Sequence, residues 1–226
     1  MKISLVIPCF NEEQSLRVLI PQLIDIVNSS DVEFILVDNG STDSTVELFK
    51  YISNSKIITT VLEKNAGYGG GIKAGLSLAR GEFMGWVHAD LQYSIFEIVR
   101  ELNQLPPDSQ YIKGKRVKRK FFQNFVSLNM SIFESLIFRT FLYDINAQPT
   151  LFYRNFINNL DALPDDFSID LYSYVIAKKS KLKISRFQVD FINRSYGEST
   201  WNSGFNSIVK MSVRTLKYSI LLRRNL

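Results

Sequence analysis

The sequence predicts an α/β fold in which helices flank a mostly parallel central sheet. Between residue 2 and about residue 116, short apolar, β-branched runs alternate with amphipathic segments of helix length. Polar, acid-rich clusters follow several of the strand-like runs, as at the ligand-binding edge of parallel sheets. The chain has 226 residues, 46% hydrophobic and 22% charged, enough for one sizeable core. We therefore expect one domain over residues 1–226.

The expected elements follow the chain in order. Strands are predicted at 2–8, 33–38, 57–62, 83–88 and 111–113, and helices at 12–28, 43–52, 70–79 and 94–104. The first helix carries Leu16, Leu19 and Leu23 on one apolar face, and Pro21 within it predicts a kink. A helical excursion rich in aromatic residues is expected over 121–142, and a basic amphipathic helix over 203–226 that suits a membrane surface.

Bulk properties limit the setting and the partners. A net charge of +5 and a pI near 9.2 favour anionic partners, which leaves open nucleotide phosphates, nucleic acid and acidic lipid surfaces. The single cysteine, Cys9, is interpreted as a small residue at a strand end. The first residues lack the pattern of a signal peptide, so we expect the chemistry in the cytoplasm. The excursion contains Gln123, Glu134 and Arg139, which argues against a membrane span.

The ends of the first two strands offer candidate nucleotide contacts. After Pro8, the ring of Phe10 is placed to stack on a base and is followed by the acid Glu12. The alternative for this segment is a plain helix start. The next cluster begins Asp38-Asn39, whose oxygens and amide suit a base edge or a ribose hydroxyl; a helix cap is again the alternative.

The end of the fourth predicted strand offers a candidate metal site. His88-Ala89-Asp90-Leu91-Gln92 follows an apolar run, and the Asp90 carboxylate is the kind of oxygen ligand that a divalent cation prefers. A lone histidine is more often structural than a ligand, so a structural His88 is the alternative.

Five motifs in order resemble those of family 2 glycosyltransferases. They are VIPCFNEE, ILVDNGSTDST, KNAGYGGGIKAGL, RGEFMGWVHADLQ and INRSYGEST, and they span residue 3 to about residue 202. Within that family the chain looks most similar to the polyprenyl-phosphate mannose synthase branch. The resemblance implies a GT-A fold and inverting transfer of a sugar from a nucleotide-diphospho-sugar.

The resemblance also assigns donor-side roles. It implies nucleotide-sugar contacts at Pro8, Phe10, Glu12, Asp38, Asn39, His88 and Asp90. It implies a divalent metal, Mn²⁺ or Mg²⁺, on Asp90, Gln92 and His88. Many relatives have two carboxylates where this chain has Asp38-Asn39, and His88 stands where the family has an acid. A neutral imidazole removes one charge near the ion, which favours Mn²⁺ over Mg²⁺.

Further residues are assigned to the acceptor side and to catalysis. Arg116 is expected to pair with an acceptor phosphate, Arg194 with the diphosphate, and Ser199 belongs to the same loop as Arg194. Asp170 is a candidate general base, or else a helix cap. The catalytic set expected from the resemblance is Asp90, Asp170 and Arg194.

Two other segments have open interpretations. The basic run of residues 113–120 is either a contact to an anionic membrane or a solvated loop. The glycine-rich stretch of residues 66–71 is either a close approach to the sugar nucleotide or a tight turn.

The sequence therefore predicts a glycosyltransferase at the inner face of the membrane, with a polyprenyl phosphate or a lipid-linked or saccharide acceptor. Residues 1–116 are expected to bind the nucleotide sugar, 117–202 to form the acceptor side, and a membrane protein is a possible partner. Nucleic acid explains the charge but none of the motifs. A catalytically impaired nucleotide-sugar-binding scaffold is the alternative, and a nucleotidyltransferase is disfavoured because residues 8–15 contain no glycine.

Overall fold

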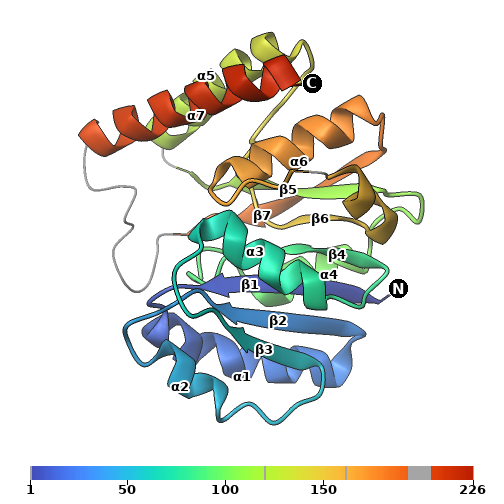
Figure 1. Cartoon of the computed structure of the whole chain (residues 1–226). Helices are drawn as coiled ribbons and strands as arrows, with labels where there is room; N and C mark the ends of the chain where they lie inside the picture. The colour runs from blue at the N-terminus through green and yellow to red at the C-terminus, as the bar shows by residue number, and fades with distance from the viewer. Residues whose placement is uncertain (1, 120, 161, 193–204, 226) are drawn as a thin grey trace.

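The computed structural model describes residues 2–119, 121–160, 162–192 and 205–225, with the backbone alone at 122, 205–212 and 225. Its strands are β1 (Ile3–Cys9), β2 (Val32–Asp38), β3 (Ile57–Val61), β4 (Phe83–Trp86), β5 (Tyr111–Val117), β6 (Thr150–Tyr153) and β7 (Ile184–Asp190). They form one sheet in the order β3-β2-β1-β4-β6-β5-β7 (Figure 1).

The sheet is mostly parallel, as predicted. Strands β1, β2, β3 and β4 run parallel, and so do β5 and β7. Strand β6 is antiparallel to both β4 and β5. The two neighbours of β6 each carry a glycine where the backbones approach closely: a Cβ on Gly85 would lie 1.9 Å from the Thr150 carbonyl oxygen, and one on Gly114 would lie 2.0 Å from that of Gln148. Neither position has room for a side chain.

The helices cover both faces of the sheet (Figure 1). They are α1 (Glu13–Ser29), α2 (Thr45–Phe49), α3 (Gly67–Leu78), α4 (Ile95–Leu102), α5 (Phe121–Phe138), α6 (Ser168–Lys179) and α7 (Phe205–Asn225), with a 3-10 turn η1 (Arg154–Asn159). One hydrophobic cluster joins the sheet to α1 and α4 through residues such as Leu23 and Ile98. A second cluster, on the opposite face, joins it to α3 and α6 through Trp86, Ile72 and Tyr174.

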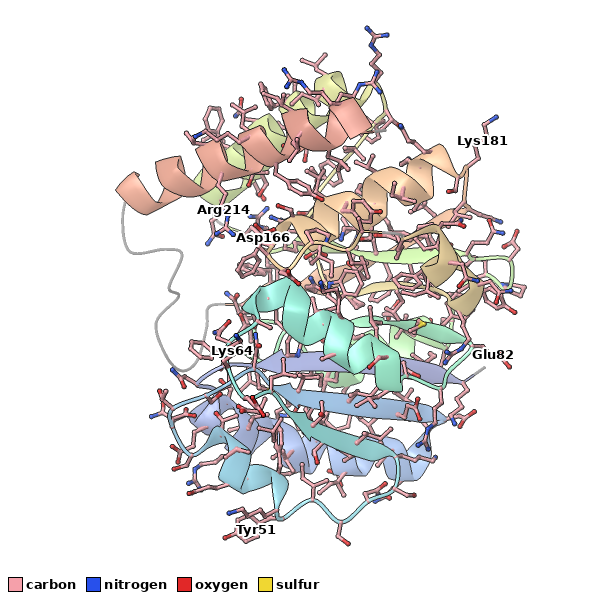
Figure 2. All side chains as sticks on the ribbon, in the orientation of Figure 1. Tyr51, Lys64, Glu82, Asp166, Lys181 and Arg214 are labelled. Carbon is pink, nitrogen blue, oxygen red and sulfur yellow. The ribbon has the colours of Figure 1, made fainter. Side chains whose placement is uncertain are left out.

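Helices α5 and α7 lie side by side beyond α6, away from the sheet (Figure 1). The Ser219 hydroxyl on α7 donates to the Glu134 carboxyl on α5 at 2.8 Å. The Arg214 guanidinium on α7 pairs with Asp166, just before α6, at 2.6 Å (Figure 2). Among the described residues, no helix combines the length and the apolar character that crossing a bilayer needs.

Three local expectations are refined. Helix α1 runs through Pro21. The glycine-rich stretch is not a loop: residues 67–71 form the first turn of α3, where a Cβ on Gly67 or Gly69 would lie within 2.3 Å of a backbone oxygen of residues 164–165. These glycines let α3 pack against that backbone.

The basic run is not one solvated or membrane-facing surface. Lys113 is fully buried, and the side chains of Arg116 and Arg119 are 12% and 9% exposed because both face Asp144. Only part of the run, including Lys115 and Lys118, is exposed.

Candidate functional site

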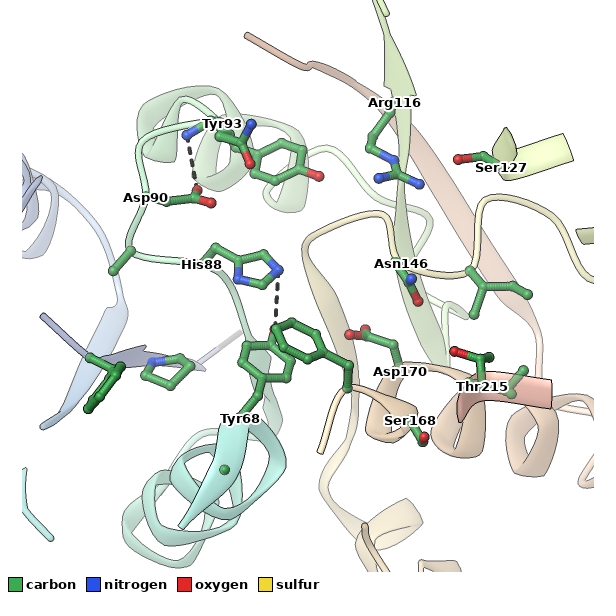
Figure 3. Close-up of a pocket in the computed structure, with 18 of the residues that line it drawn as sticks. Tyr68, His88, Asp90, Tyr93, Arg116, Ser127, Asn146, Ser168, Asp170 and Thr215 are labelled. Atoms are coloured by element: carbon green, nitrogen blue, oxygen red, sulfur yellow. Dashed lines mark hydrogen bonds between the residues drawn. The ribbon is translucent and has the colours of Figure 1, made fainter. Parts of the chain in front are cut away.

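A cavity of about 720 Å³ lies at the carboxyl ends of β1, β2 and β4 and extends to α5 and α7 (Figure 3). Its walls include most of the predicted donor-side residues: Pro8, Phe10, Glu12, Asn39, His88, Asp90 and Gln92. Arg116 and Asp170 line the same cavity on the opposite side (Figure 3). Side chains from distant parts of the chain, from Pro8 to Asp170, thus line one cavity, whose volume is typical of a small-molecule binding site.

The loops after β1 and β2 hold each other in place. The Asn11 carboxamide oxygen accepts from the Thr42 backbone N–H at 2.8 Å, and the Ser41 hydroxyl accepts from the Asn11 N–H at 2.9 Å. On this framework the ring of Phe10 remains 41% exposed at the cavity, available to stack.

The two polar residues at the end of β2 form hydrogen bonds with backbone groups. Asn39 donates to the Gly67 carbonyl at 2.8 Å and accepts from the Ala66 N–H at 3.0 Å. Asp38 is 2% exposed, accepts from the Ser41 N–H at 3.3 Å and is not on the cavity wall. Asn39 therefore positions the start of α3 beside the cavity, and a direct contact of Asp38 with a nucleotide stays a prediction.

A strained turn after β4 presents Asp90. Leu91 has a φ of 57°, an uncommon value for a leucine, and Asp90 Oδ1 accepts from the Gln92 N–H at 3.2 Å (Figure 3). The Gln92 carbonyl accepts from the Ile192 N–H at 3.1 Å, which ties the turn to the segment after β7. The turn holds the Asp90 carboxylate at the cavity.

His88 belongs to an aromatic stack. Its ring centroid lies 5.0 Å from that of Tyr68, which itself stacks on Phe167 at 4.4 Å. The Tyr68 hydroxyl lies 3.4 Å from His88 Nε2 and accepts from the Gln148 amide at 3.3 Å. Because Gln148 donates to the Tyr68 hydroxyl, that hydroxyl can still donate its own proton to His88 Nε2. In this arrangement His88 would have to release Tyr68 before Nε2 could bind an ion.

Asp170 is the centre of a buried polar network. It is 1% exposed and accepts from Thr150 at 3.0 Å and from Trp86, Lys113 and Gln148 at 3.3 Å each. Burial lowers the pKa of Lys113 to about 8, although the Asp170 charge opposes the shift. The sequence predicts a base or a helix cap at this position. The structure places Asp170 in the first turn of α6 with one buried cation and three neutral donors around it, and its role as a base stays a prediction.

Arg116 faces Asp144 rather than solvent. Its Nε donates to Asp144 Oδ1 and its backbone N–H to Oδ2, each at 2.8 Å. Burial alone would raise the pKa of the Asp144 carboxyl, but the Arg116 charge and hydrogen bonds hold it below the usual value. Arg116 still lines the cavity, so a preorganised cation is available there.

Other outcomes complete the site. Arg194 and Ser199 lie outside the described residues, so their roles stay predictions. The described residues hold no cluster of three or more His, Cys, Asp or Glu side chains that would bind a metal unaided. The sequence did not single out Tyr68, Lys113 or Glu134 for a role at the site, because their partners are distant in the chain. The one available signal was that Glu134 is the only acid of its helix.

The chain matches a known protein family and several curated relatives. The family model described as glycosyl transferase family 2 matches residues 4–160. An undecaprenyl-phosphate 4-deoxy-4-formamido-L-arabinose transferase from Yersinia enterocolitica is 38% identical over 104 residues, 44% of this chain and 32% of the relative. A dodecaprenyl-phosphate galacturonate synthase from Rhizobium johnstonii is 34% identical over 126 residues, 53% of this chain and 37% of the relative.

Solved structures support the fold. Glucosyl-3-phosphoglycerate synthase from Mycobacterium tuberculosis, crystallised with Mn²⁺, uridine diphosphate and glucosyl-3-phosphoglycerate, superposes with a TM-score of 0.74 at 16% identity. That match covers 98% of this chain and 79% of the other. The match to the curated relatives, by contrast, spans only about a third of their length. By its motifs, its sheet and the family model that matches it, this chain belongs to glycosyl transferase family 2 and has a GT-A fold.

Proposed function

We propose that this protein is an inverting glycosyltransferase that moves a sugar from a nucleotide-diphospho-sugar to a polyprenyl phosphate. An acceptor phosphate oxygen attacks the anomeric carbon and forms the new C–O bond. The bond from that carbon to the diphosphate breaks on the opposite face, and the nucleoside diphosphate leaves with the electron pair. Residues 1–116 serve the donor, apart from Lys113 and Arg116 near the end of this range, and residues 117–202 serve the acceptor.

The donor site is assembled from the ends of β1 and β4. Phe10 stacks on the base, Pro8 and Glu12 border it, and Asp90 faces the diphosphate. A divalent ion would be held by Asp90 and the diphosphate oxygens, with Gln92 or His88 as further ligands; such ions need only one or two protein ligands beside phosphates. Bound there, the ion would stabilise the charge of the leaving diphosphate. Relatives in fold that crystallised with Mn²⁺ or Mg²⁺ support this choice.

The observation that carries the acceptor assignment is that Asp170 is occupied by hydrogen-bond donors while Arg116 lines the same cavity. A sugar hydroxyl needs a base to remove its proton, whereas a phosphate is already an anion at neutral pH. Asp170 Oδ1 already accepts from Trp86, Lys113 and Thr150, so this oxygen has no lone pair left to take a proton from an acceptor hydroxyl. Arg116 offers a cation in the same cavity. Two relatives named as polyprenyl-phosphate sugar transferases support the same assignment.

An exposed apolar stripe on α5 supports contact with a membrane surface. It consists of Phe121, Phe125, Leu128, Ile132 and Leu136, each 49% exposed or more and spaced three or four residues apart. Val213, Ile220 and Leu221 on α7 are also exposed. Helix α7 contains no acid, and the only acid of α5, Glu134, is buried. We infer that this pair of helices rests on an anionic lipid surface. We further propose that this surface is the cytoplasmic face of a membrane and that a membrane protein is a partner there.

The test combines donor binding with turnover. UDP-, GDP- and dTDP-sugars are screened by thermal shift with and without Mn²⁺, and the sugars that bind are then supplied in labelled form with a polyprenyl phosphate. The proposal predicts label in the lipid extract with wild type. Donor binding without transfer to any acceptor would contradict it and would favour a nucleotide-sugar-binding scaffold.

A further inference from the structure

The cavity has a second end, between α5 and α7, across from the proposed donor side. We call it the inter-helix end, and it is lined by Ser127, Met130, Ser131, Glu134, Ile145, Leu171 and Thr215. Figure 3 shows Ser127 and Thr215 on the side of Arg116 and Asp170, across from His88 and Asp90. On α5, Glu134 lies seven residues beyond Ser127, which is about 10 Å along the helix axis. The inter-helix end therefore extends past the phosphate position at Arg116.

Glu134 is the unusual residue of this end. Its side chain is fully buried, its Oε1 accepts from the Ser219 hydroxyl at 2.8 Å, and its Oε2 has no hydrogen-bond partner among the described residues. A buried carboxylate without a cation is costly, and such groups usually become neutral instead. Burial raises the pKa of Glu134 to about 7, and the hydrogen bond from Ser219 opposes the shift.

Among the side chains that the structure describes, no cation pairs with Glu134. Within the described part of the chain, none of the charged groups on the surrounding elements makes an ion pair with it; on α7, Arg214 pairs with Asp166, and beside β5 Arg116 pairs with Asp144 and Lys113 with Asp170. The other titratable side chains of α7 in that part are Lys217, Tyr218, Arg223 and Arg224, and none of them donates to Glu134. The state of the carboxyl is therefore set by burial and by Ser219.

We propose that the inter-helix end binds the first isoprenoid units of the acceptor, and that Glu134 must be neutral for this apolar chain to enter. This inference rests on the proposed function, because it identifies the apolar part of the same acceptor. Met130, Ile145 and Leu171 supply apolar contacts, and a hydrocarbon chain that fills the cavity in place of solvent would lower the dielectric constant around Glu134 and disfavour its ionised form. Glu134 is thus a specificity-determining residue that makes acceptor binding depend on pH.

The pH dependence has a definite sign. With a pKa of about 7, roughly nine-tenths of Glu134 is neutral at pH 6 and about 3% at pH 8.5. Binding of an isoprenoid should therefore weaken by up to roughly 30-fold between these pH values. The Gln variant cannot ionise, so its affinity should stay constant over the range.

The experiment measures farnesol binding to the full chain by calorimetry between pH 6 and 8.5. Farnesol does not titrate, so the pH profile reports on the protein alone. Wild type and the exposed-acid control Glu63→Gln should lose affinity as the pH rises, whereas Glu134→Gln should not. Ser219→Ala removes the hydrogen bond that opposes the shift and should move the midpoint to higher pH. Circular dichroism and nucleotide binding check that each variant is folded.

The results separate this inference from the proposed function. A flat profile in wild type, an unchanged profile in Glu134→Gln, or no farnesol binding at pH 6 would each overturn the inference, even if sugar transfer is observed. A pH step that Glu134→Gln removes would support it, even if no donor sugar is transferred.

Discussion

The two sides of the cavity differ in how their polar and ionisable side chains are held in place. On the donor side, from β1 to β4, polar side chains are tied to nearby backbone: Asn39 to residues 66–67, Asn11 to Thr42, and Asp90 to Gln92. On the acceptor side, buried ionisable groups such as Lys113 and Asp170 pair across distant segments, while the outer faces of α5 and α7 expose apolar residues. The donor side therefore holds its polar side chains in place through hydrogen bonds to backbone, which suits a polar ligand. The acceptor side suits a ligand that is charged at one end and apolar at the other.

The largest expected effect concerns the donor side. Asp90→Asn should reduce turnover by about 1,000-fold or more, because the proposed ion loses its carboxylate ligand, a loss of about 4 kcal/mol. Steady-state rates with the preferred donor and Mn²⁺ measure this. Near wild-type turnover would remove Asp90 from the mechanism and with it the functional contrast between the two sides.

The next effect concerns stability on the acceptor side. Lys113→Met should lower the free energy of unfolding by about 3–5 kcal/mol, since it leaves the Asp170 carboxylate buried without its cation. Chemical denaturation near pH 7 measures the loss. The double variant Lys113→Met, Asp170→Asn should recover much of it. A loss below about 1 kcal/mol would show that the pair carries no structural role.

A smaller effect concerns the outer surface. Replacing Phe125 and Leu136, 55% and 72% exposed, by serine should weaken binding to phosphatidylglycerol vesicles by about tenfold each. The matched control is Tyr51→Ser, an 82% exposed aromatic at the opposite end of the molecule from α5 and α7 (Figure 2). Equal losses in all three variants in a sedimentation assay would place the membrane contact elsewhere.

The smallest effect concerns the choice of ion. His88→Asp restores a carboxylate beside Asp90 and should improve the use of Mg²⁺ relative to Mn²⁺ by a few fold, because Mg²⁺ prefers oxygen ligands. The ratio of turnover with the two ions is the readout, and Tyr68→Phe is a useful partner variant since it frees His88 Nε2 from the tyrosine. An unchanged ratio in both variants would mean that His88 has no part in ion choice.

The difference between the donor side and the acceptor side also explains which features could be predicted from the sequence. Strands β1 to β5 and helices α1, α3 and α4 follow local periodicity, and the three strand-end motifs predicted residues that the structure places on the cavity wall, such as Phe10, Asn39 and Asp90. Strands β6 and β7 were not predicted. Strand β6 has only four residues and is inserted antiparallel between β4 and β5, which leaves little local signal, and β7 pairs with β5, a strand distant in the sequence. Lys113 belongs to a basic run that the sequence left open between a membrane contact and a solvated loop, but it is buried and its partner is 57 residues away. Pairing between distant segments is set by the tertiary fold, which periodicity does not encode.

The most direct test of the account compares a polyprenyl phosphate with the same chain ending in an alcohol. Both are offered to the protein with the donor sugar that binds it, and the lipid extract is analysed by mass spectrometry. The account predicts a sugar attached through phosphate, a product that forms only from the phosphorylated chain. Transfer to the alcohol, or no transfer to the phosphate despite donor binding, would contradict it.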